Sequence, residues 1–101
     1  GTAEAAVFTV ADTLQSDYER GRVLKTAAGG RPLPAASIAR IIDAAGRMQS
    51  DYERAGVLTL LVRHQTLDAA QRAAYRRAAE AMHSRYEQDR ALAALARSEG
   101  R

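Results

Sequence analysis

The sequence has no cysteine, no tryptophan, one phenylalanine and two prolines in 101 residues. The absence of cysteine excludes a disulfide framework, thiol catalysis and a thiolate metal site. The longest strongly apolar stretch, Val57 to Val62, is far too short to span a bilayer. The first residues also lack the basic region and apolar block of a signal peptide. These absences leave the cellular compartment open.

Alanine is the main component of the apolar fraction, with 23 copies in a chain that is 47% hydrophobic. Alanine loses no side-chain entropy in a helix, so this composition favours helices. The length suits a single domain with one modest core. Of the 15 basic residues 14 are arginine, and the net charge is only +3.

A repeat of 34 residues is the strongest signal in the sequence. The heptapeptide at 14–20 returns at 48–54, with six consecutive identical residues, and in a weaker form at 82–88. Such self-similarity is typical of stacked supersecondary units. It predicts one helical-repeat domain over residues 1–101, with units at about 1–33, 34–67 and 68–101.

Each copy of the heptapeptide contains Ser-x-x-Glu, the pattern of a capping box. In a capping box the serine side chain accepts from an N–H of the first helical turn, and the glutamate reaches back to the N–H of the serine. Because each box directly follows another helical pattern, it predicts a tight corner inside a helical hairpin. The expected pairs are Ser16 with Glu19, Ser50 with Glu53, and Ser84 with Glu87.

The periodicity predicts an all-α fold of six helices in three stacked antiparallel hairpins, an α-solenoid. The expected helices are Ala3–Gln15, Asp17–Ala28, Ala35–Gln49, Asp51–Arg63, Asp68–His83 and Arg85–Ser98. Tyr75 and Arg76 replace Ile41 and Ile42 of the second unit, so the last hairpin is expected to be the more polar one. We therefore expect the chain to be the C-terminal part of a longer array. Alternatively, the first hairpin forms a homodimer.

The motif Ser-Asp-Tyr-Glu-Arg followed by Val-Leu resembles tandem helical repeats of bacterial envelope or membrane-anchored proteins, whose role is not established. The third copy departs from it at Arg85, Gln88 and Ala91. This resemblance implies a HEAT-like array in a bacterial protein, with a periplasmic or membrane-anchored location through a part of the parent protein not present here. It implies no catalytic residue.

Catalytic and metal sites are not expected. Glu80 and His83 spell Glu-x-x-His on one predicted helical face, but a di-iron bundle needs two such pairs and two more glutamates. His64 has no second ligand at metal spacing, and every motif serine already has a capping role. We expect no enzyme activity, no metal and no cofactor.

The recurring tyrosines, Tyr18, Tyr52 and Tyr86, have two interpretations. They could form a binding ladder with one ring per unit. Alternatively, each ring packs across its corner with only its hydroxyl at the surface. Their identical placement in every unit favours the structural role.

Arginines of the predicted fifth helix provide the main functional cue. Such a patch could bind nucleic acid, an anionic membrane or an acidic protein, but i,i+4 ion pairs could instead make it an ordinary charged surface. These arginines are not accompanied by a row of aromatic residues that could act as a stacking platform, which disfavours nucleic acid, and nothing supports a membrane surface. The preferred function is a non-catalytic module that binds another protein or another part of its parent chain, and anion binding is the alternative. The candidate partner-binding residues are Arg63, Arg72, Arg76 and Arg77.

Overall fold

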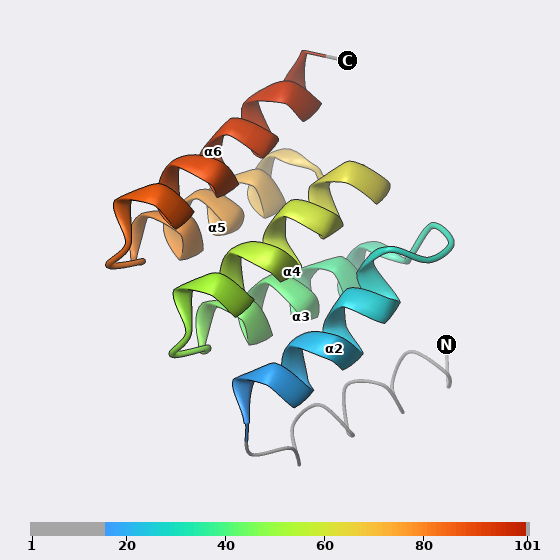
Figure 1. Ribbon diagram of the computed structural model, residues 1–101. Coiled ribbons are helices and arrows are strands. Elements are labelled where there is room, and N and C mark those ends of the chain that lie inside the picture. Colours follow the sequence, from blue (N-terminus) through green and yellow to red (C-terminus); the bar gives the residue numbers. More distant parts are fainter. Residues whose placement is uncertain (1–15, 101) are drawn as a thin grey trace.

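The computed structural model describes residues 16–100, and every element within that range is a helix. The predicted helix Ala3–Gln15, and with it much of the proposed dimer surface, lies outside the described residues. Helices α2, α4 and α6 lie side by side in one layer, while α3 and α5 form a second layer behind it (Figure 1). The helices are α2 (Asp17–Ala28), α3 (Ala35–Gly46), α4 (Asp51–His64), α5 (Ala69–Glu80) and α6 (Arg85–Glu99).

The predicted helix boundaries are close for the front layer and too long for the back layer. Helix α2 has the predicted bounds, and α4 and α6 each extend one residue beyond the prediction. In contrast, α3 ends at Gly46 and α5 at Glu80. The residues after these ends form the corners at 47–50 and 81–84, because the next helix must turn back within a few residues.

The three serines cap their helices as predicted, but the second half of the capping box is wrong at two corners. Each serine Oγ accepts from the backbone N–H of the glutamate three residues later, at 3.0–3.2 Å. The N–H groups of Ser50 and Ser84, however, donate to aspartates of the preceding front-layer helix. The glutamates Glu53 and Glu87 instead form ion pairs. A reciprocal capping box is present at Asp68, where α5 begins.

Two aspartates connect successive corners of the molecule. The Oδ2 atom of Asp17 accepts from the N–H groups of Gln49 and Ser50, at 2.7 and 2.6 Å. The Oδ2 atom of Asp51 accepts in the same way from His83 and Ser84, at 2.9 and 2.6 Å. We call these contacts the Asp17 bridge and the Asp51 bridge. The bridges fix the front-layer helices in register at their N-terminal ends.

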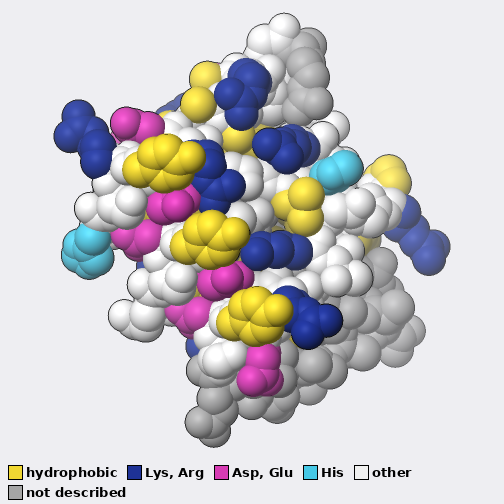
Figure 2. Space-filling model, viewed as in Figure 1, with side chains coloured by type: hydrophobic (Ala, Val, Ile, Leu, Met, Phe, Trp, Pro, Cys, Tyr) yellow, Lys and Arg dark blue, Asp and Glu magenta, His cyan; other side chains and the backbone are white. Residues whose placement is uncertain are grey.

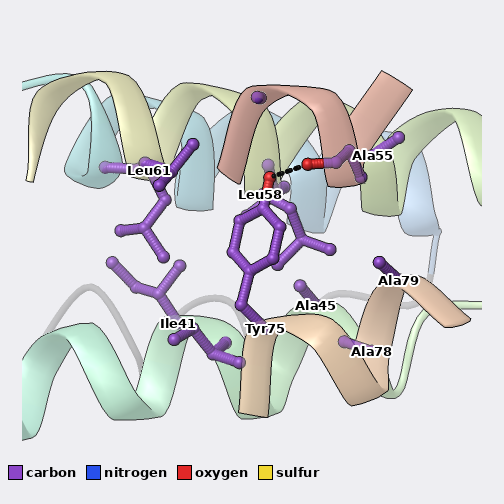
Figure 3. Close-up of a cluster of buried hydrophobic side chains, with 14 of the residues drawn as sticks. Ile41, Ala45, Ala55, Leu58, Leu61, Tyr75, Ala78 and Ala79 are labelled. Atoms are coloured by element: carbon purple, nitrogen blue, oxygen red, sulfur yellow. Dashed lines mark hydrogen bonds between the residues drawn. The ribbon is translucent and has the colours of Figure 1, made fainter. Parts of the chain in front are cut away.

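The core lies between the two layers. The apolar residues at helical spacing over 38–48 are all buried, four of them in α3 and Met48 in the corner after it: Ile38, Ile41, Ile42, Ala45 and Met48. Helix α4 is buried over most of its surface because it packs against α2, α3 and α6. Figure 3 shows Leu58 and Leu61 of α4 facing Ile41 and Tyr75 of the back layer.

Tyr75 belongs to this core, so its polarity does not make the last hairpin more polar. Its side chain is fully buried and its hydroxyl donates to the carbonyl oxygen of Ala91 at 2.7 Å (Figure 3). Burial raises the pKa of Tyr75 well above its ordinary value, because the phenolate would lose its hydration. Tyr75 and Arg76 replace two isoleucines of the second unit, and of these two residues only Arg76 is exposed. Arg76 pairs with Glu99 at 3.3 Å.

Candidate interaction surfaces

The four predicted partner-binding arginines do not form one patch. Arg63 and Arg72 line a depression of about 340 Å³ at one end of the molecule, together with Glu99. Arg76 joins this region through its ion pair with Glu99. Arg77 instead lines a groove between α3 and α5. The structure therefore brings three of the arginines to one region, beside a carboxylate, and separates the fourth.

Two of these arginines already have partners in the chain. The guanidinium of Arg72 donates to the carbonyl of Leu67, and Arg76 donates to Glu99. Two of the i,i+4 pairs that the sequence allows, Asp68–Arg72 and Arg76–Glu80, do not form, because Asp68 caps α5 and Arg76 reaches α6. The pairs Asp43–Arg47 and Arg85–Asp89 do form, at 3.5 and 3.9 Å.

The groove between α3 and α5 is the larger hollow, with a volume of about 640 Å³. Small side chains line most of it, mainly alanines of both helices. The buried side chain of Arg54 also contributes, and it donates to the carbonyls of Met48 and Ala78. These carbonyls lie at the C-terminal ends of α3 and α5, where a cation compensates the helix dipoles. Arg54 therefore has a structural role, because its guanidinium stabilises the C-terminal ends of these two helices.

The tyrosines of the heptapeptide form the most distinctive surface. As whole residues, Tyr18, Tyr52 and Tyr86 are 62%, 64% and 73% exposed, so the expectation that each ring packs across its corner is wrong. Figure 2 shows a diagonal row of exposed hydrophobic side chains on this face, with basic and acidic groups beside them. Because α2, α4 and α6 lie side by side, the three residues occupy equivalent places near the start of each helix. We call this row the tyrosine ladder.

Cations flank the rings of the ladder. The guanidinium of Arg22 lies 5.9 Å from the ring centre of Tyr18. Tyr52 has a cation from each neighbouring helix, Lys25 of α2 and Arg90 of α6, both at 5.9 Å. Such distances suit cation–π attraction. The ladder is therefore a charged aromatic surface, in which side chains from three helices contact one another.

Two of these cations are neutralised within the chain. Lys25 pairs with Glu53 at 3.1 Å and Arg90 with Glu87 at 2.8 Å. Arg22 is exposed and pairs with no carboxylate of the described part of the chain. Lys25, Arg22 and Arg90 were not identified from the sequence. Lys25 and Arg90 contact the ring of Tyr52 from neighbouring helices, 27 and 38 residues away along the chain. The recurrence of the tyrosines was the available signal.

The Glu-x-x-His pair is not on one helical face. Helix α5 ends at Glu80, and His83 lies in the corner, where its N–H donates to Asp51. Within residues 16–100, no three potential ligand residues gather into a metal-binding group. No helix in the same range is long and apolar enough to cross a membrane.

The chain matches no protein-family model, no curated protein and no solved structure. The function must therefore be argued from the geometry of the described residues.

Proposed function

We propose that the chain is a non-catalytic helical-repeat module, an α-solenoid of 34-residue units that binds another protein through the tyrosine ladder. The HEAT-like character and the bacterial, envelope-associated setting expected from the sequence belong to this proposal. The observation that carries it is the exposure of three large aromatic side chains in one row on a chain that has only five aromatic residues.

Exposed aromatic residues support an interaction role on energetic grounds. Tyrosine is enriched in protein interfaces, where its flat ring gives a large contact area and its hydroxyl can still form hydrogen bonds. A charged residue at the same surface position would avoid the unfavourable free energy of exposing an aromatic ring to water. The retention of a ring in all three units is therefore better explained by contact with a partner.

The bridges support the repeat part of the proposal. The Asp17 bridge and the Asp51 bridge use the same atoms at an offset of 34 residues. The equivalent position in the third unit is Arg85, whose side chain has no hydrogen-bond acceptor. A further unit could therefore not attach to this corner in the same way, which agrees with the idea that the third hairpin ends the array.

Anion binding through the arginines is the weaker alternative. The region around Arg63 and Arg72 includes Glu99, which reduces its positive potential, and Arg76 is already paired. If anion binding is the function, affinity for an oligonucleotide or for anionic vesicles will fall steeply as salt is raised, because phosphate contacts release counterions. Weak binding with no salt dependence would exclude it.

Selection from a library of random peptides tests the proposal. The bait is the full chain, and the control is a triple variant, Tyr18→Ser with Tyr52→Ser and Tyr86→Ser. Because the three rings are exposed, the variant is expected to keep the circular dichroism spectrum and thermal stability of the parent chain. The proposal predicts enriched peptides that bind the parent chain and lose affinity for the variant. Equal binding to both proteins would refute it.

A further inference from the structure

We propose that the tyrosine ladder binds a proline-rich peptide in the polyproline II conformation, with an acidic residue of the peptide beside Arg22. This inference rests on the proposed interaction function and adds the class of partner. It follows from three properties of the ladder, which are its spacing, its aromatic character and its uneven charge.

The ring spacing expected from helix packing is close to the period of a polyproline II helix. The axes of packed helices lie about 8–10 Å apart, and the three tyrosines occupy equivalent places on neighbouring helices. A polyproline II helix has three residues per turn and rises about 3.1 Å per residue, so one turn advances about 9.3 Å. Prolines at every third position would therefore meet successive rings. Three rings correspond to the pattern Pro-x-x-Pro-x-x-Pro.

Aromatic side chains with alternating charges are suitable for this ligand. Proline-rich segments dock on surfaces lined by aromatic rings, and they lose little entropy on binding because their conformation is already restricted. The ion pairs Lys25–Glu53 and Arg90–Glu87 lie along the ladder and can contact the residues between the prolines. A neutral glycan could also stack on the rings, but it would not use these charges.

The charge of the ladder is uneven, which gives the peptide a direction. Around Tyr52 the cations are balanced by Glu53 and Glu87. At the α2 end, Arg22 lies over Tyr18 and has no carboxylate partner in residues 16–100. An acidic residue at the end of the peptide that reaches Tyr18 would supply that partner. At the opposite end, no cation of residues 16–100 lies over the ring of Tyr86, the ladder residue of α6.

Synthetic peptides test this inference on the full chain. The probes have four Pro-Gln-Ala units, with two glutamates placed before or after them, and a third probe has no glutamates. A control peptide has the same composition as the first probe but carries its prolines at every fourth position. We expect the three-residue spacing to bind roughly ten-fold or more tightly than the control, and one of the two acidic probes to bind more tightly than the neutral probe.

Three variants locate the binding site. Tyr52→Ala, at the centre of the ladder, should weaken binding by roughly five- to ten-fold, which is typical of an aromatic residue that contributes strongly to an interface. Arg22→Ala should reduce the affinity for the preferred acidic probe to that for the neutral probe. Asp43→Ala, on the exposed face of α3 in the other layer, should leave binding unchanged.

Several results would overturn the inference. These are equal affinity for the two proline spacings, no effect of Tyr52→Ala, or binding of β-1,4-linked N-acetylglucosamine oligomers to the ladder without binding of the proline peptides. If the random-peptide selection enriches ladder-dependent peptides without a three-residue proline period, this inference fails while the proposed function stands. If the selection itself shows no dependence on the ladder, both fail.

Discussion

Removal of the Asp51 bridge by the substitution Asp51→Ala should strongly destabilise the fold. The carboxylate of Asp51 accepts two backbone N–H groups, from His83 and Ser84, and these groups have no other acceptor within the corner as described. It also lies in the first turn of α4, where a negative charge favours the helix dipole. In the Asp51→Ala variant both effects are lost, and the N–H groups of His83 and Ser84 can then donate only to water.

The magnitude follows from the type of hydrogen bond. A hydrogen bond to a charged group contributes about 1.5–3 kcal/mol to the free energy of unfolding when it is shielded from water. The corner is partly open to solvent, so we expect a loss of about 2–4 kcal/mol for the two bonds together. In a domain of this size each kcal/mol lowers the melting temperature by about 4–8 °C. The melting temperature should therefore fall by roughly 10 °C or more.

Thermal and urea unfolding, monitored by circular dichroism, measure this effect. The matched control is Asp43→Ala, because Asp43 is 70% exposed and forms one exposed ion pair with Arg47, worth at most about 1 kcal/mol. Asp51→Asn keeps one acceptor oxygen without the charge and should have an intermediate effect. If Asp51→Ala and Asp43→Ala have equal stability, the bridge does not hold the corners together and the reasoning is refuted.

Three further predictions concern single positions in the fold. Ser50→Ala should cost about 1 kcal/mol in urea unfolding because it removes a helix cap, and an unchanged midpoint would contradict the capping role. As pH rises through about 10 the parent chain should lose stability, because the unfolded state releases the tyrosine proton more readily than buried Tyr75 does. The stability of Tyr75→Phe should decline less steeply with pH, and parallel stability curves for the two proteins would argue against burial as the cause. Gly46→Ala should stabilise α3 by up to about 1 kcal/mol, since the new methyl group meets only ordinary contacts. Gly21→Ala should not give this gain, because its Cβ would lie 2.5 Å from Glu53 Oε1. An equal gain in stability at both glycines would be inconsistent with this packing.

The regular parts of the fold were predictable from the sequence because they depend on local chemistry. The serine caps act within one helical turn, and they predicted the first residues of α2, α4 and α6 in agreement with the structure. The ends of the back-layer helices were placed too late for two different reasons. Gly46 is a local stop signal at the end of α3 that the helical pattern on both sides of it obscured. At α5, alanine continues the helical pattern without interruption, so nothing local indicates that the helix must end at Glu80.

The contacts that define the candidate surface depend on tertiary packing. Asp17 and Asp51 stand in the first turn of their helices, and only the placement of neighbouring corners shows that they bridge to the next unit. The tyrosines recur for a reason that sequence alone cannot assign, since a buried ring and an exposed ring give the same pattern. Arg76 and Arg77 are adjacent in sequence but lie in different regions, because successive residues of a helix point about 100° apart.

The tyrosine ladder, in this proposal, is the surface that contacts a partner. The most direct measurement is an NMR titration of the chain, with its tyrosine rings isotopically labelled, against the tightest peptide from the selection. The ring resonances of Tyr18, Tyr52 and Tyr86 should shift during the titration, while those of buried Tyr75 should not. Binding that leaves the three ladder resonances unchanged would contradict the proposal.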